Sequence, residues 1–178
     1  DKYHINGQEV YVGNVLSGKI KKGEIAKCYP EGKNVRVRKI LEFERELKVG
    51  RAPQAIGIIT NGKLKRGNIL GKGARPIITK NFSPLVFCLI ESIEEGKNYT
   101  LRCVTQEIKC KIKRIDEKID IDTLKKTKNV KQLKETEIGR LEIALEKPIV
   151  LEKFNTLKEL GRFVILKEGK IIAGGIVT

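Results

Sequence analysis

The sequence has no methionine and few aromatic residues, which make up 5% of its 178 residues. Because translation starts at methionine, a chain that begins with Asp1 and holds no methionine is expected to be a piece of a longer protein or a processed form. Scarce aromatic rings leave few surfaces on which nucleic-acid bases could stack. No apolar run approaches the roughly 20 residues of a membrane-spanning helix, and residues 1–7 lack the apolar stretch of a signal peptide. We therefore expect a cytoplasmic chain that makes no contact with a membrane.

Metal ligands of the nitrogen and sulfur type are scarce as well. Cys28, Cys88, Cys103 and Cys110 form no C-x-x-C pair, and His4 is the only histidine. Since such metal sites need clustered thiolate or imidazole ligands, the sequence predicts none. Each cysteine stands among alternating apolar residues, which is typical of buried thiols in a reducing compartment rather than of disulfides.

Three aspartates follow one another at short spacing, namely Asp116, Asp120 and Asp122. A carboxylate site for Mg²⁺ needs ligands that converge from several elements of the fold. These residues stand on what reads as the edge of a single strand, so a solvated face is the better interpretation.

Positive charge is in excess, with a formal net charge of +15. Residues 1–76 hold 17 Lys and Arg against 7 Asp and Glu, whereas residues 77–178 hold 20 against 15. This asymmetry allows a nucleic-acid partner for the first half. Lysine-rich solvated strand faces produce the same excess, so charge alone does not decide the function.

Apolar residues recur at every second position over most of the patterned segments. In residues 35–38, 108–113 and 141–146, an apolar side chain alternates with one that is in most cases charged. This period of two places apolar side chains on one face of a strand and charges on the other. No segment shows a convincing amphipathic helix with caps. The sequence therefore predicts an all-β fold of antiparallel barrels or sandwiches.

Glycine-containing turns and a linker divide the chain. A polar residue, a glycine and a lysine follow one another at residues 31–33, 61–63, 95–97 and 168–170, each time between two strand-like runs. Two glycines and a proline in residues 71–76 interrupt both strand and helix. We expect two domains, residues 1–75 and 76–178. Within the second, the lysine-rich residues 124–135 are expected to form an exposed loop or a short helix across one end of a barrel.

The stretch "GNVLSGKI", residues 13–20, matches the first part of a phosphate-binding loop, with Gly13, Gly18 and Lys19 at the required spacing. Ile20 stands where the motif needs the hydroxyl that binds Mg²⁺, and Gly23 would interrupt the helix that should follow. Gly13, Gly18 and Gly23 instead mark a turn-rich barrel corner, in which Gly18 and Gly23 sit at tight turns where glycine adopts positive φ at little cost. On this interpretation Val15, Ile20 and Ile25 would face the barrel interior.

Extended, the same stretch resembles the second domain of translation-factor-type GTPases. The resemblance rests on "GNVLSGKIKKGE" at residues 13–24, followed by "VRVRKI", "AIGII" and "KRGNIL" in order. "LGRFVILKEGKIIAGGIV" at residues 160–177 resembles the closing hairpin of the third domain. The resemblance covers nearly the whole chain and implies two tandem antiparallel β-barrels of the domain II and domain III type.

Within that superfamily, three stretches resemble the GTPase subunit of bacterial sulfate adenylyltransferase (ATP sulfurylase). Elongation factors usually have His-Thr in the third domain where this chain has Thr105-Gln106, and the sulfurylase subunit typically has Thr-Gln. "KIDIDTLKK" at residues 118–126 and "TEIGRLEIALEKPIV" at residues 136–150, which contains Ile138-Gly139, also resemble that subunit. Glu137 replaces its usual Asn, and Arg162 resembles the elongation-factor pattern.

The resemblance implies the partners and cofactors of the parent protein. GTP and Mg²⁺ would bind an N-terminal GTPase domain that lies outside this sequence, and a small catalytic subunit would form adenylyl sulfate from ATP and sulfate. The present chain would be a non-catalytic docking and relay module. Arg162, beside Phe163 in the closing hairpin, could pair with an acidic group on a neighbouring domain, although a solvated arginine is the commoner interpretation of such a residue. The alternative is an elongation-factor-type GTPase whose second and third domains bind aminoacyl-tRNA, in which case nucleic acid would be a partner.

Overall fold

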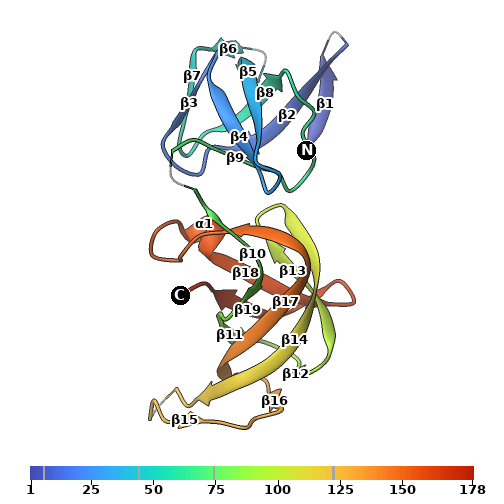
Figure 1. The fold of residues 1–178 in the computed structure, drawn as a ribbon, viewed down its shortest axis with the longest axis vertical. Helices are drawn as coiled ribbons and strands as arrows, with labels where there is room; N and C mark the ends of the chain where they lie inside the picture. The colour runs from blue at the N-terminus through green and yellow to red at the C-terminus, as the bar shows by residue number, and fades with distance from the viewer. Residues whose placement is uncertain (6, 44, 74, 122) are drawn as a thin grey trace. The chain divides into compact units, whose positions relative to one another are not determined.

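The chain is built from antiparallel strands in two compact units. The computed structural model describes residues 1–5, 7–43, 45–73, 75–121 and 123–178. Unit 1 comprises Asp1–Arg75 and unit 2 comprises Pro76–Thr178, so the boundary falls inside the segment that the sequence marks as a linker. Within the described residues the only α-helix is the four-residue α1 (Lys158–Gly161) (Figure 1). The predicted all-β fold is confirmed.

Unit 1 is a curled antiparallel sheet with a small ribbon beside it. Its strands are β1 (Lys2–Ile5), β2 (Gln8–Asn14), β3 (Lys19–Lys21), β4 (Ile25–Tyr29), β5 (Lys33–Glu42), β6 (Arg45–Leu47), β7 (Val49–Arg51), β8 (Ala55–Thr60) and β9 (Ile69–Gly71). The sheet order is β1-β2-β8-β5-β4-β9, with β6 paired to β5, while β3 and β7 form the ribbon. Residues from β2, β3, β5, β6, β8 and β9 all meet in one apolar cluster, because the sheet and the ribbon enclose a common interior.

The alternation in β5 decides which of its side chains face the interior of unit 1. Val35 and Val37 are buried, whereas Arg36 and Arg38 are exposed. Burying an aliphatic side chain contributes about 1.5–3 kcal/mol each, so a period of two that puts valines inward and arginines outward stabilises this strand in one orientation only.

The three glycines in and after the stretch that resembles a phosphate-binding loop occupy different environments. Gly18 and Gly23 have φ of +66° and +84°, the left-handed region that glycine adopts without a steric penalty. Gly13, the first glycine of the barrel-turn motif, lies within β2, opposite Ile56, and is a strand residue. Lys19 begins β3 instead of a helix.

Of the three side chains expected inside unit 1, two are there. Val15 and Ile20 pack against the buried cluster, but Ile25 is 47% exposed. In β4 the inward positions belong to Ala26 and Cys28, and a strand residue next to an inward one points outward. The expectation for Ile25 is therefore wrong by one residue of register.

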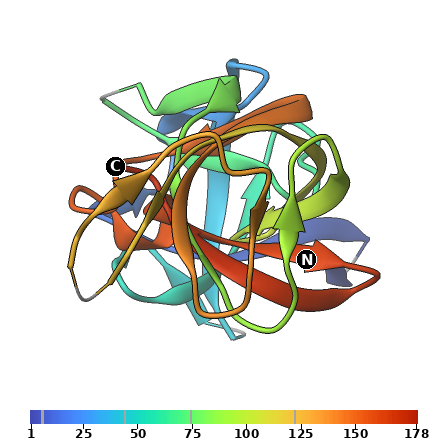
Figure 2. The same cartoon turned by 90° about the horizontal axis from the view of Figure 1, so that it is seen from below.

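Unit 2 is a closed barrel. Its elements are β10 (Ile77–Phe82), β11 (Leu85–Cys88), β12 (Ile93–Glu94), β13 (Asn98–Cys103), β14 (Gln106–Ile119), β15 (Lys126–Thr127), β16 (Gln132–Leu133), β17 (Ile138–Leu151), α1, β18 (Arg162–Lys167) and β19 (Lys170–Ile176). The order β17-β11-β19-β18-β13-β14 closes through a further pairing of β14 with β17, and in Figure 2 these strands curve round on themselves. Closure leaves fewer unpaired strand edges.

The lysine-rich residues 124–135 connect β14 to β17. They hold the two-residue strands β15 and β16, which pair with β14 and β12 respectively. The described residues of this segment contain no helix, and most are exposed, which agrees with the expected loop. Leu133 is the exception, since it is fully buried and holds the segment down on the barrel.

Candidate functional site

Gln106, in the Thr105-Gln106 pair that the sequence analysis singled out, has a structural role. It is 4% exposed and is the only buried polar or charged side chain among the described residues. Its Nε2 donates to Val150 O and its Oε1 accepts from Val150 N, both at 2.8 Å. Thr105 precedes it, exposed in the turn between β13 and β14. In this pair, Gln106 therefore links β14 to β17 through two hydrogen bonds, and Thr105 contributes an exposed hydroxyl.

Gly139, in the Ile138-Gly139 pair that the sequence analysis singled out, lies where three chain segments crowd together. A Cβ at this position would stand 2.7 Å from Leu133 Cδ1 and 2.9 Å from the carbonyl oxygen of Glu117. Glycine therefore lets β17 approach both β14 and the lysine-rich segment. Ile138 precedes it as the first residue of β17 and is partly buried.

Arg162 is exposed at the first position of β18. No hydrogen bond or ion pair of its side chain to another described residue is found. Its neighbour Phe163 is buried and meets Phe82 edge to face, with ring centroids 5.6 Å apart at 75°. The backbone that carries Arg162 is thus fixed by packing, while its guanidinium points to solvent. These three sets of residues do not form a common site.

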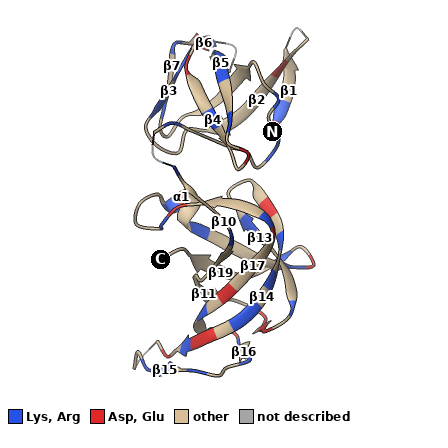
Figure 3. Cartoon of the chain, in the orientation of Figure 1, with Lys and Arg blue, Asp and Glu red and all other residues tan. Residues whose placement is uncertain are grey.

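A site that the sequence did not predict lies at the end of the barrel where β14 leads into the lysine-rich segment. It is a pocket of about 580 Å³, which we call the charged pocket. Its lining residues are Glu95, Arg114, Ile115, Asp116, Glu117, Lys128, Asn129, Val130, Lys131 and Arg140. Figure 3 shows acidic and basic residues following one another along this part of β14.

Two bulges in β14 shape the wall of the charged pocket. Relative to β17, the register of β14 shifts between Ile112 and Arg114 and again between Ile115 and Glu117. Each shift inserts one extra residue, which breaks the strict alternation of sides. A sequence signal for this exists, because the buried isoleucines in "CKIKRIDEKI" are spaced by three residues rather than by two.

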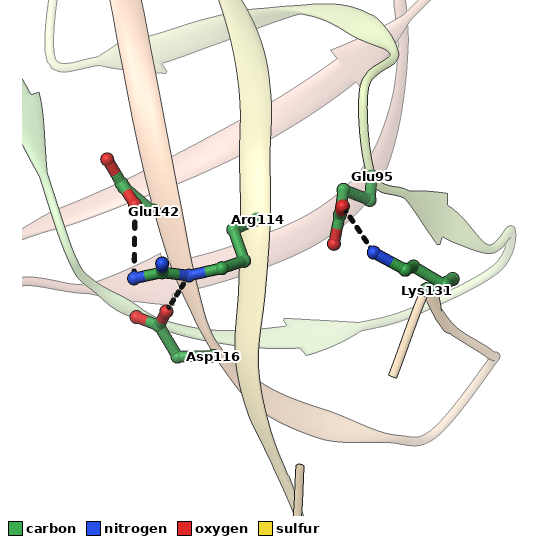
Figure 4. Close-up of polar contacts among 5 residues, drawn as sticks. All are labelled: Glu95, Arg114, Asp116, Lys131 and Glu142. Atoms are coloured by element: carbon green, nitrogen blue, oxygen red, sulfur yellow. Dashed lines mark hydrogen bonds and ion pairs between the residues drawn. The ribbon is translucent and has the colours of Figure 1, made fainter. Parts of the chain in front are cut away.

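Arg114 is held between two carboxylates (Figure 4). Its Nε donates to Asp116 Oδ1 at 2.6 Å, and its Nη2 lies 3.3 Å from Glu142 Oε2 on the neighbouring strand. Arg114 and Glu142 are direct cross-strand partners. The hydrogen bond from Arg114 to Asp116, with the negative charges around it, raises the pKa of the guanidinium, which is fully charged near neutral pH in any case.

The lysine-rich segment is tied to the barrel by two ion pairs. Lys131 Nζ lies 2.7 Å from Glu95 Oε1 (Figure 4), and Lys126 Nζ lies 2.8 Å from Glu117 Oε1. Glu117 also faces Arg140, with 3.7 Å between Oε1 and Nε. The hydrogen bond from Lys131 lowers the pKa of Glu95. The wall of the charged pocket is therefore lined by ion pairs between acidic and basic side chains.

The described side chains offer little for covalent or metal chemistry. The buried positions of Cys28, Cys88, Cys103 and Cys110 raise the pKa of each thiol to about 11, so the nucleophilic thiolate is rare near neutral pH. Among the described residues there is no group of three His, Cys, Asp or Glu side chains that could hold a metal ion. Of the three aspartates noted in the sequence, Asp116 pairs with Arg114 and Asp120 accepts hydrogen bonds from Thr123, while Asp122 lies outside the described residues.

Comparison with known proteins identifies relatives over the whole chain. Residues 85–178 match the family described as GTP-eEF1A C-terminal domain-like. A sulfate adenylyltransferase subunit 1 from Tolumonas auensis is 28% identical over 160 residues, which cover 88% of this chain and 34% of that protein. An elongation factor 1-alpha from Metallosphaera sedula is 29% identical over 185 residues, which cover 99% of this chain and 42% of that protein.

The fold is also found in solved structures. A crystal structure of Sup35 complexed with GDP superimposes with a TM-score of 0.91 at 20% identity, covering all of this chain and 45% of that one. The chain thus spans less than half the length of these proteins. In the part of the chain that the structure describes, no helix has both the length and the apolar character needed to cross a membrane.

Proposed function

The chain belongs to the GTP-eEF1A C-terminal domain-like family, and we propose that it forms the two β-barrel domains that follow the GTPase domain in a sulfate adenylyltransferase GTPase subunit. The observation that carries this proposal is the similarity to proteins named sulfate adenylyltransferase subunit 1 over 88% of the chain. The Thr105-Gln106 and Ile138-Gly139 pairs agree with it, since both resemble that subunit.

In this proposal the chain itself is not catalytic. GTP and Mg²⁺ bind a preceding GTPase domain, and a small subunit forms adenylyl sulfate and pyrophosphate from ATP and sulfate. The barrels serve as rigid bodies that dock against the GTPase domain and the small subunit, so that the nucleotide state is passed on as a rearrangement of domains. The four free, buried cysteines fit a protein that works in a reducing compartment such as the cytoplasm.

The test uses the full-length protein, co-expressed with a candidate small subunit of sulfate adenylyltransferase from the same organism. Adenylyl sulfate formation is measured with GTP, with GDP, and with the small subunit alone. We expect a complex that co-purifies and a rate that rises only when GTP and both proteins are present. Absence of both the complex and the stimulation by GTP would remove this function.

The second candidate is an elongation-factor-type GTPase that binds aminoacyl-tRNA. The 29% identity to an elongation factor 1-alpha over 99% of the chain favours it, as does the excess of basic residues in residues 1–76. Phosphate contacts release counterions, so tRNA affinity should fall about 10³-fold or more between low and moderate salt if several such contacts form. A filter-binding series that shows no salt-sensitive binding of tRNA excludes this candidate.

A further inference from the structure

We propose that the charged pocket of unit 2 binds a small molecule through a phosphate or another oxyanion group. The pocket volume of about 580 Å³ lies within the range of roughly 300–1,000 Å³ typical of small-molecule sites. This inference does not depend on the proposed function, because it rests on the walls of unit 2 alone.

The pocket has more positive than negative charge to offer a ligand. Four cationic side chains line it, namely Arg114, Lys128, Lys131 and Arg140, against the three carboxylates of Glu95, Asp116 and Glu117. Each of these carboxylates already faces a cation: Glu95 faces Lys131, Asp116 faces Arg114, and Glu117 faces both Arg140 and Lys126, which is outside the lining. The negative groups are therefore compensated within the protein.

Lys128 is the cation that remains. No hydrogen bond or ion pair of its ammonium group to another described residue is found, although it stands in the lining of the pocket. It lies between Lys126 and Lys131 in the chain, and the ion pairs of these two lysines tie the segment to the barrel on both sides. The backbone under Lys128 is thus held in place, and its charge is available to an anion.

The two arginines supply further donors in fixed orientations. Arg114 uses Nε for Asp116 and Nη2 for Glu142, which leaves Nη1 without an acceptor among the described residues. Arg140 donates from Nη1 to the carbonyl oxygen of Ser83 and to Thr178 Oγ1. A guanidinium has five N–H donors in a rigid plane that matches the oxygens of a phosphate. The two carboxylates that bind Arg114 and the carbonyl that binds Arg140 hold each guanidinium in place. Less entropy is therefore lost when an oxyanion binds.

The lining also excludes an apolar ligand. Ile115 and Val130 are the only apolar residues among the ten that form the wall, and Ile115 is only 2% exposed. Pockets for hydrophobic ligands are lined mainly by apolar and aromatic side chains. Concave shape and charge together favour a compact polar anion over an extended acidic peptide, which would gain more from the exposed lysines outside the pocket.

The experiment titrates inorganic pyrophosphate, and separately inorganic phosphate, into the isotopically labelled 178-residue chain while backbone amide signals are followed by NMR. We expect saturable shifts at residues 114–117, 128–131 and 140. Lys128→Glu should weaken pyrophosphate binding about tenfold or more, since it replaces a charge-assisted contact by repulsion. The matched control is Lys125→Glu, which makes the same charge change in the same segment at an exposed residue outside the lining.

Three results would overturn the proposal. The first is the absence of saturable shifts with either anion. The second is an equal loss of affinity in both variants, which would show that only the overall charge matters. The third is a short single-stranded RNA that shifts the same signals at far lower concentrations than pyrophosphate, which would identify a nucleic-acid backbone as the source of the phosphate. Selective loss in Lys128→Glu, together with shifts confined to the lining, supports it.

Discussion

Gln106 and Val150 are joined by two hydrogen bonds of 2.8 Å, one in each direction, although 44 residues separate them in the chain. The main-chain pairing of β14 with β17 runs from Ile119 only as far as Cys110, which faces Leu145. The amide of Gln106 therefore acts as one additional rung between the two strands, made by a side chain. Its two groups match the carbonyl and N–H of a residue in a ladder.

Replacing Gln106 by leucine should destabilise unit 2 by about 2–6 kcal/mol. The substitution keeps the volume similar, but it leaves the N–H and the carbonyl of Val150 buried without partners, at about 1–3 kcal/mol each. Urea unfolding monitored on the unit 2 transition measures the change. Thr105→Ala, one residue away and exposed, is the control and should stay within about 0.5 kcal/mol. Equal stability of the Q106L variant and the wild type would show that water replaces the rung.

Gly139→Ala should destabilise unit 2 by about 1–3 kcal/mol through overpacking. The added methyl would stand 2.7 Å from Leu133 Cδ1 and 2.9 Å from the backbone oxygen of Glu117, and backbone moves aside less easily than a side chain. Gly174→Ala is a matched control in β19, since nothing lies within 4 Å of its Cβ position. Denaturant midpoints of the two variants provide the comparison. A G139A variant no less stable than G174A would mean that β17 can shift at no cost.

Glu137 should make unit 2 less stable as the pH falls into the acid range. Burial opposes ionisation of this carboxyl, but hydrogen bonds from Lys118 and from the backbone N–H of Lys134 outweigh it, so its pKa is lowered. A pKa lowered by folding contributes stability above the pKa of the unfolded chain, and this contribution is lost as the pH falls through the folded pKa.

Glu137→Gln should therefore cost about 1 kcal/mol near neutral pH, and the difference from the wild type should disappear in acid, once the carboxyl is protonated in both states. Thermal unfolding across a pH series from neutral to acid tests this. Glu135→Gln, a neighbouring exposed carboxyl, should show no such trend. A cost for E137Q that is the same at every pH would trace the effect to shape rather than to charge.

Arg162→Ala should leave the stability of the isolated chain within about 0.5 kcal/mol, because the side chain is exposed and makes no hydrogen bond or ion pair with another described residue. If Arg162 meets an acidic group on a neighbouring domain, the same variant in the full-length protein should reduce GTP-stimulated adenylyl sulfate formation. Lys147→Ala removes an exposed positive charge elsewhere in unit 2 and is the control. Unchanged stimulation in the R162A variant would remove this residue from the interface.

Local alternation was enough to predict most of the strands. The patterns at residues 35–38, 108–113 and 141–146 all lie in strands, because a period of two is a property of the strand itself and needs no knowledge of its neighbours. The same reasoning failed for Ile25, where it gave the wrong face. Which residues of a short strand face inward depends on where its pairing begins, and the partner strand sets that position.

The sequence by itself determined that this chain is all-β, that its apolar and charged faces are separate, and that it divides near Arg75, since each of these follows from residues close together in the chain. Only the tertiary structure decided which charges meet. Glu95 and Lys131 are 36 residues apart, and the bulges of β14 change which side chains face the pocket. It likewise decided that Gln106 stabilises the barrel and that Gly139 must lack a side chain, because the partners of both come from strands that only folding brings together.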